Sequence, residues 1–404
     1  MHYLCPQKRY TMETFYHTHA YLVEHTHAAV RRDLMDEIDW SAPLIGIKGT
    51  RGVGKTTFLL QYARERWGTD RACLYVDMND FYFSAHSIVD FAREHHHHGG
   101  RVLLIDQVYK HPGWQEELRQ CHDELTGLKI VFTGSSVMRL KDEDSPLRDI
   151  VASYNLRGFS LREYLNLRAG TDFRACTLDD IISDHEAMAR QVTAEVRPMD
   201  YLQDYLRHGF YPFFLEKRDF SENLLKTVNM MVEVDILIIK QIELKYLSRI
   251  KKLLYLLAVE GPKAPNVSQL AGDIQTSRAT VMNYIKYLAD ARLINMVYPT
   301  GEQFPKKPSR IMMHNPNLMY CIGPQAKVDE HEVLETFLVN SLWKDHQVSV
   351  GGRRASLMID GTRPVRVCTE GTRLKPSPDV TYAVHGLNVG RGNIIPLWLF
   401  GFLY

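Results

Sequence analysis

The sequence predicts an α/β protein whose N-terminal part is a doubly wound parallel sheet. Three short apolar runs, at 44–47, 73–76 and 102–105, have the composition of buried strands. Between them, the stretches 56–66 and 87–94 carry apolar residues at helical spacing. Strands that alternate with helices favour a parallel sheet covered by helices on both faces, and such sheets bind ligands at the carboxyl ends of their strands.

The first predicted strand leads directly into a glycine-rich loop and a helix, which is the context of the Walker A motif. The glycines allow backbone N–H groups to turn inward around a phosphate, and the helix N-terminus adds a partial positive charge. Lys55 would supply a positive charge to the β- and γ-phosphates, and Thr56 a hydroxyl ligand to Mg²⁺. The predicted nucleotide-binding residues are Gly49, Thr50, Arg51, Gly52, Val53, Gly54, Lys55, Thr56 and Thr57.

Four histidines at 95–98 follow the second predicted helix and precede two glycines. Adjacent side chains of a helix or strand point in different directions, so the run is poorly arranged for one metal ion. We interpret it as a solvated loop, with metal binding as the alternative.

The third run, 101–106, ends in a carboxylate as a Walker B strand does, and Asp106 would hold Mg²⁺ through water. Gln107 follows, where most ATPases of this kind have glutamate. An amide can orient the attacking water but is a very poor proton acceptor. The sequence therefore predicts tight nucleotide binding and slow hydrolysis. A naturally weakened site and a deliberate substitution made to trap the nucleotide both remain open.

A further apolar run at 129–132 leads to Thr133 and Ser135. In P-loop ATPases with an additional central strand, a polar residue at the end of that strand senses the γ-phosphate. Either residue could do so here, and the alternative is the N-cap of a helix.

Length, charge and cysteine usage narrow the class of protein. A chain of 404 residues predicts two or three domains, and a net charge of only +1 gives no global field that would attract nucleic acid. No run approaches the roughly 18 apolar residues that span a bilayer, and the N-terminus lacks a signal-peptide pattern. The six cysteines are scattered. We expect a cytoplasmic protein with reduced thiols and no membrane partner.

Beyond the Walker motifs, the chain resembles bacterial and archaeal AAA-type ATPases related to the STAND and "archaeal ATPase" groups. The resemblance reaches the C-terminus and therefore covers essentially the whole chain. It implies that the nucleotide is ATP rather than GTP. The segments that carry it are 104–114, 132–136, 157–165, 208–214 and 395–402.

The resemblance implies four parts. Residues 1–165 would form the P-loop core, 166–244 a helical lid, 245–310 a winged helix and 311–404 a domain like PD-(D/E)XK nucleases. Arg148 matches an arginine that contacts a γ-phosphate in its own subunit or in a neighbouring one. Contact with a neighbouring subunit would imply a homo-oligomer. The alternative is that Arg148 is an ordinary surface arginine. Pro212 resembles a lid proline that packs near adenine, or else is a turn proline.

Within 245–310, the spacing predicts a helix-turn-helix followed by a wing strand. Ser268 and Ser277 are expected N-caps, and the second helix should bury Val281, Tyr284, Ile285 and Leu288. This part has 11 lysines and arginines against 4 aspartates and glutamates. Two roles remain open: contact with DNA, or packing within the chain or against a protein. The residues expected on the outer face of the second helix are Arg278, Thr280, Asn283 and Lys286.

A nuclease of the implied C-terminal fold needs three acidic residues and a lysine around Mg²⁺. Glu335 and Asp360 could supply the first two carboxylates, but Arg366 stands where the third is expected, and Glu370 and Lys375 have the wrong spacing. We therefore expect an inactive nuclease-like fold, with 397–400 as one of its strands. Three functions follow from the sequence: a nucleotide-dependent switch or remodelling ATPase that acts on protein or DNA, a nucleotide-binding regulator that hydrolyses little, and an ATP-gated nuclease.

Overall fold

A computed structural model describes residues 11–216, 219–323, 328–353, 355–369, 371–372 and 376–404. The chain divides into two compact units between Arg157 and Gly158. This division lies eight residues before the end of the predicted ATPase core at 165.

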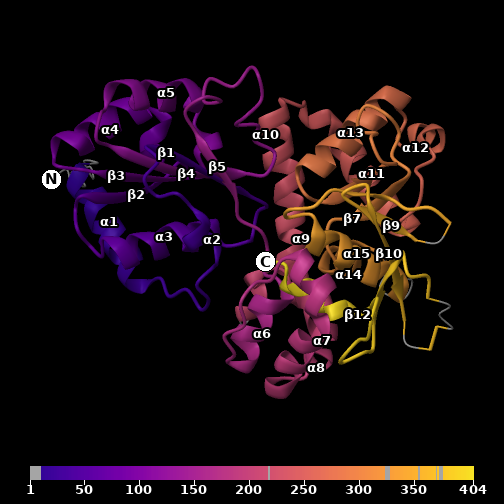
Figure 1. Ribbon diagram of the computed structural model, residues 1–404. Coiled ribbons are helices and arrows are strands. Elements are labelled where there is room, and N and C mark those ends of the chain that lie inside the picture. The colour runs from indigo at the N-terminus through magenta and orange to yellow at the C-terminus, as the bar shows by residue number, and fades with distance from the viewer. Residues whose placement is uncertain (1–10, 217–218, 324–327, 354, 370, 373–375) are drawn as a thin grey trace. The chain divides into compact units, whose positions relative to one another are not determined.

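The first unit contains a five-stranded parallel sheet, as the alternation of strands and helices predicts (Figure 1). Its strand order is β2-β3-β4-β1-β5, so β4 is an additional strand between the strands that carry the two Walker motifs. β1 and β3 are almost completely buried, which agrees with the apolar runs 44–47 and 102–105 that they contain. The strands are β1 (Leu44–Gly49), β2 (Cys73–Asp77), β3 (Val102–Asp106), β4 (Lys129–Ser135) and β5 (Ala152–Asn155).

Helices cover both faces of this sheet: α4 and α5 lie on one face, and α1 and α3 on the other (Figure 1). This is the doubly wound arrangement that the sequence predicts. The helical segments of the first unit are α1 (Met12–His25), α2 (Leu34–Glu37), α3 (Lys55–Arg66), η1 (Phe81–Ser84), α4 (Ile88–His97), η2 (Val108–Lys110) and α5 (Trp114–Glu124).

The prediction of a solvated histidine loop is wrong. Residues 95–97 form the last turn of α4, and His95 is completely buried. His95 lies four residues after the buried Phe91, so the helical repeat carries it onto the face that meets the sheet. Its Nε2–H donates to the carbonyl of Val102 at 3.1 Å, and its Nδ1 accepts from the hydroxyl of Tyr16 at 3.0 Å. Within the described ranges, no cluster of three metal-ligating side chains occurs.

The second unit begins with a helical region. It includes two π-helical turns, and Pro212 is the first residue of a short 3-10 helix. Its segments are α6 (Leu161–Ala169), α7 (Leu178–Glu195), α8 (Pro198–Asp204), η3 (Tyr205–Gly209), η4 (Pro212–Leu215), α9 (Phe220–Met230), η5 (Met231–Ile236), α10 (Leu237–Lys240) and η6 (Leu244–Tyr246).

Three helices and a two-stranded antiparallel sheet follow, in the order that the helix-turn-helix and wing pattern predicts. Ser277 caps its helix by accepting from the backbone N–H of Thr280, as predicted. Ser268 is not a cap, because Asn266 accepts from the N–H of Gln269 and the helix begins at Val267. The elements are α11 (Leu247–Glu260), α12 (Val267–Asp273), α13 (Arg278–Asp290), β6 (Ile294–Val297) and β7 (Arg310–Met313).

The predicted inward face of α13 is confirmed. The four side chains expected there are all buried: Val281, Tyr284, Ile285 and Leu288.

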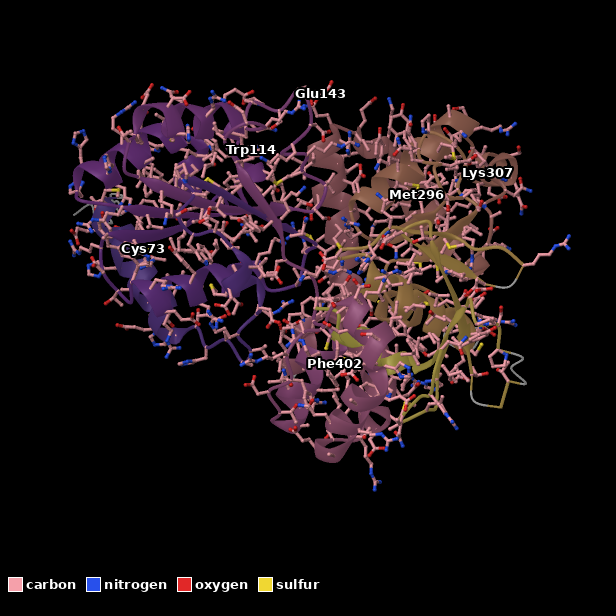
Figure 2. The ribbon with its side chains drawn as sticks, in the orientation of Figure 1. Cys73, Trp114, Glu143, Met296, Lys307 and Phe402 are labelled. Atoms are coloured by element: carbon pink, nitrogen blue, oxygen red, sulfur yellow. The ribbon has the colours of Figure 1, made fainter. Side chains whose placement is uncertain are left out.

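The C-terminal part contains a mixed five-stranded sheet with the order β12-β11-β10-β9-β8. Residues 397–402 form a 3-10 helix, η8, so the strand predicted at 397–400 is wrong. Phe402 (labelled in Figure 2) packs against Trp398 and Phe173. The elements are α14 (Pro316–Ile322), α15 (Glu330–Leu342), β8 (Val348–Val350), β9 (Leu357–Ile359), β10 (Arg363–Cys368), β11 (Thr381–Val384), β12 (Ile394–Pro396) and η8 (Leu397–Phe402).

Candidate nucleotide-binding site

The glycine-rich loop between β1 and α3 has a backbone that side chains would obstruct. Gly52 and Gly54 have φ values of 86° and 94°, in the left-handed region that favours glycine. A Cβ at Gly49 would come within 2.4 Å of the carbonyl oxygen of Leu156. The loop therefore needs these glycines for its path as well as for access to a phosphate.

Lys55 is held at the centre of the loop. Its Nζ donates to the carbonyls of Gly49 at 2.9 Å and Thr50 at 2.8 Å, so the ammonium spans the loop at the N-terminus of α3. Val53 is almost completely buried and anchors the loop to the core. Arg51 donates to the hydroxyl of Tyr109 at 2.8 Å. The backbone N–H groups of the first turn of α3, including that of Thr57, have the arrangement that binds an anion.

Asp106, at the carboxyl end of β3, is fully buried and surrounded by hydrogen-bond donors. Its Oδ2 accepts from the hydroxyls of Thr56 at 2.5 Å and Tyr75 at 3.0 Å. Its Oδ1 accepts from the backbone N–H of Gln107 at 3.0 Å and from the hydroxyl of Thr133. The structure thus brings together Thr56 and Asp106, the two predicted magnesium ligands.

These residues fit a magnesium ion. A hydroxyl and a carboxylate in direct contact are both hard oxygen donors, which suit Mg²⁺, and phosphates and water commonly complete its coordination. Burial and the charge of Asp106 raise the pKa of Tyr75, so its hydroxyl stays protonated and donates to the Asp106 carboxylate.

Thr133 and Ser135, the two sensor candidates, have different contacts. Thr133 is buried and its hydroxyl bonds to Asp106, while its oxygen also accepts from the N–H of Gln107 at 3.1 Å. The hydroxyl of Ser135 accepts from the N–H of Val137 at 3.3 Å, which stabilises the turn after β4. Thr133 is thus in direct contact with the Walker B carboxylate.

Gln107 has an unusual backbone conformation, with a φ of 54°. Its Nε2 donates to both carboxylate oxygens of Asp77, each at 3.3 Å. Asp77 ends β2 and pairs in register with Asp106 at the end of β3. Burial and the nearby charge of Asp106 raise the pKa of Asp77, against the opposing effect of the Asn79 N–H.

Asp77 was not among the residues predicted from the sequence, although a signal for it was present. The apolar run 73–76 ends in a carboxylate just as the Walker B run does. Because neighbouring parallel strands end at the same edge of the sheet, the second carboxylate could have been expected beside the first.

Arg148 and Pro212 are not brought to this site by any described contact. Arg148 is exposed in the segment between β4 and β5. Pro212 belongs to the second unit, where it starts η4. Their roles at the γ-phosphate and adenine therefore remain predictions.

The two predicted nuclease carboxylates have other partners. Glu335 is buried and forms an ion pair with Arg310 at 2.5 Å. Asp360 accepts from His346 Nδ1 at 2.8 Å and from the N–H of Gln347 at 2.9 Å. Glu370 and Lys375, the substitute ligands considered above, lie outside the described residues.

The predicted outer face of α13 is only partly available to a ligand. Arg278 and Asn283 are exposed, and Thr280 is half-buried at the helix N-terminus. Lys286 is half-buried and donates to Asp290 at 2.7 Å, and Lys240 contacts the other oxygen of that carboxylate at 3.1 Å. Lys286 is thus already engaged in an ion pair within the chain.

Two segments of the chain match known families. Residues 41–165 match a family described as an AAA domain, and residues 199–316 match a domain of unknown function (DUF8612). An uncharacterized protein of Methanocaldococcus jannaschii is 25% identical over 279 residues, which are 65% of this chain and 58% of the relative. The match therefore spans less than two thirds of that protein's length.

Two solved structures give a weak similarity. A variant of RuvB from Thermotoga maritima has 16% identity and a TM-score of 0.28, covering 71% of this chain and 90% of that chain. AMPPCP-bound DnaA from Aquifex aeolicus has 15% identity and a TM-score of 0.24, covering 69% and 87%. TM-scores this low carry no argument.

The AAA match covers the parallel sheet and the Walker residues, so residues 41–165 have the fold of an AAA-type P-loop ATPase. Among the helices of the described ranges, none is both long enough and apolar enough to span a membrane.

Proposed function

We propose that the chain binds ATP with Mg²⁺ and hydrolyses it, acting as a nucleotide-dependent switch or remodelling factor in the cytoplasm. The convergence of Lys55, Thr56 and Asp106 at the carboxyl edge of the parallel sheet carries this proposal. Phosphate binding needs a cation and backbone N–H donors, and Mg²⁺ needs oxygen ligands beside the phosphates. Lys55 with the loop supplies the first requirement, and Thr56 with Asp106 supplies the second.

Each residue would have a distinct role. Lys55 would exchange its contacts with the carbonyls of Gly49 and Thr50 for the oxygens of the β- and γ-phosphates. Thr56 would ligate Mg²⁺ directly, and Asp106 would hold it through water. When bound, the metal neutralises charge on the transferred phosphate. Thr133 would keep the Asp106 carboxylate oriented, and Ser135 remains the second candidate sensor.

The proposal is tested by calorimetric titration of ATP with Mg²⁺ into the full chain and its Lys55→Ala variant. We expect the variant to lose measurable binding, because Lys55 is the side-chain charge that the loop presents to the phosphates. Lys141→Ala removes an exposed lysine of the same unit and should bind ATP as the unmodified chain does. Micromolar affinity in the Lys55→Ala protein would contradict the assignment.

We further propose that residues 245–310 form a winged helix and that 311–404 contain a nuclease-like fold without a working metal site. Arg310 already pairs with Glu335 and His346 with Asp360, and Arg366 is exposed on β10. DNA binding is a second candidate function, supported by the exposed Arg278 and Asn283. The ion pair between Lys286 and Asp290 instead supports a packing role for α13.

The remaining assignments extend the proposal to an assembly. Since Arg148 is exposed, it could serve the γ-phosphate of a neighbouring subunit in a homo-oligomer. The assignment of Pro212 as a lid proline that packs near adenine is part of the same proposal.

A further inference from the structure

Two complementary side chains meet where β2 and β3 end. The amide of Gln107 donates to both carboxylate oxygens of Asp77 at 3.3 Å. A carboxylate can accept a proton from water, whereas an amide can only orient water by hydrogen bonding. The pair therefore contains both functions that activation of a nucleophilic water requires, divided between two strands.

The backbone holds Gln107 in this arrangement. Its left-handed conformation is uncommon and unfavourable for a residue with a side chain. The N–H of Gln107 donates to Asp106 at 3.0 Å and to Thr133 at 3.1 Å, which fixes the turn after β3. This turn allows the side chain of Gln107 to reach Asp77 on the neighbouring strand.

The two carboxylates at this edge differ in their remaining capacity to accept protons. Each carboxylate oxygen of Asp106 already accepts two hydrogen bonds, and the four donors come from four different residues. Its proposed role is to hold Mg²⁺. In Asp77, Oδ1 accepts from the backbone and side chain of Asn79 at 2.9 and 2.7 Å. Within the described residues, Oδ2 of Asp77 accepts only from Gln107 Nε2, so this oxygen can accept a further hydrogen bond, such as one from water.

We propose that Asp77 is the general base of ATP hydrolysis and that Gln107 is the positioning residue that orients Asp77 and the attacking water. This inference rests on the proposed ATPase function. The water oxygen forms a bond to the γ-phosphorus as the bond from that phosphorus to the β–γ bridging oxygen breaks. ADP leaves with the bonding electron pair, and the proton of the water passes to Oδ2 of Asp77, which later releases it to solvent.

The prediction of slow hydrolysis took account only of the residue that follows Asp106. In this chain, the carboxylate and the amide occupy the ends of β2 and β3, respectively. A protein with the amide at position 77 and the carboxylate at position 107 should then retain the chemistry, because the ends of β2 and β3 would still lie beside each other.

The test compares the full-length chain with Asp77→Asn, Gln107→Glu and the double variant that carries both changes. Single-turnover hydrolysis of ATP with Mg²⁺ gives the rate, and calorimetry gives ATP affinity separately. We expect Asp77→Asn to slow hydrolysis by about 10²-fold or more with nearly unchanged affinity, as loss of a positioned base does. The double variant should recover at least about tenfold of that loss, since it restores one carboxylate and one amide.

Gln107→Glu alone should not accelerate hydrolysis, because it places two carboxylates in contact and they compete for one proton. Asp70→Asn is the matched control. It makes the same substitution at an exposed residue that precedes β2, at the other end of the strand from Asp77, and should leave the rate unchanged.

Hydrolysis by Asp77→Asn at the rate of the unmodified chain would overturn the proposal, as would a hundredfold acceleration by Gln107→Glu alone. Because affinity is measured separately, a misfolded Asp77→Asn protein would be recognised by its loss of ATP binding. In that case, the hydrolysis rate of the double variant decides the outcome. An unmodified chain that binds ATP without hydrolysing it would overturn the role of Asp77 but leave the nucleotide site intact. A chain without ATP affinity would remove the proposed function itself.

Discussion

Two buried histidines should make the ATPase domain sensitive to mild acid. His19 of α1 accepts from the backbone N–H of Tyr75 on β2 at 3.1 Å, and His95 of α4 donates to Val102 at the start of β3. Both are essentially inaccessible to solvent. Burial lowers the pKa of each to about 4 from the ordinary value of 6.5.

The sign and size of the effect follow from proton linkage. Between pH 6.5 and 4, the unfolded chain binds protons at these histidines and the folded chain does not, so stability falls as the pH falls. Above 6.5 these groups contribute no pH dependence, and below about 4 their effect levels off. At pH 5 each histidine should lower the free energy of unfolding by about 2 kcal/mol. The free energy of an opening that exposes both should therefore fall by about 4 kcal/mol.

Hydrogen–deuterium exchange, measured by mass spectrometry on peptides that cover β2 and β3, tests this effect within the first unit. After correction for the chemical exchange rate, protection at pH 5 should fall about 500-fold relative to pH 7 if the peptides exchange by openings that expose both histidines. The double variant His19→Asn and His95→Gln keeps an acceptor and a donor without a titrating ring, so its loss should be much smaller. His17→Gln, at an exposed position of α1, is the control. An equal loss in the double variant would refute the reasoning.

The two other predictions concern the second unit. Arg278→Glu should weaken any binding of duplex DNA and reduce the slope of its log–log salt dependence by roughly one unit per lost phosphate contact. The control Arg190→Glu, on α7, should change neither. Absence of duplex affinity at low salt would favour a packing role. The chain should cleave neither single- nor double-stranded DNA with Mg²⁺ or Mn²⁺, with or without ATP, and Asp360→Ala should leave ATP binding unchanged. Metal-dependent cleavage that disappears in Asp360→Ala would contradict the assignment of an inactive fold.

The parallel sheet and the Walker residues were predictable because their chemistry depends on consecutive residues. The glycines, Lys55 and Thr56 act at fixed spacing along one loop, and Asp106 ends an apolar strand. The apolar run 129–132 was expected to be a strand, but its position between β1 and β3 comes from the structure.

Other elements were mispredicted where burial overrides composition. His95 belongs to a run of polar residues, but the helical repeat of α4 makes it part of the core. Residues 397–400 are completely buried, and a short apolar run in a core reads the same as a strand or as a helical turn. Asn266 and Ser268 are both good N-caps, and only the start of α12 decides between them.

The Asp77–Gln107 pair was missed for a different reason, and that reason changes how the site is understood. A motif reads residues in order along one strand, so an amide after Asp106 indicates a weakened site when it is considered alone. In a parallel sheet, however, the ends of adjacent strands are as close as consecutive residues, and the register of β2 with β3 places Asp77 beside Asp106. The chemistry needs a carboxylate and an orienting amide near one water molecule, irrespective of which strand supplies each. A glutamine at this position is therefore informative only together with the residue at the end of the neighbouring strand.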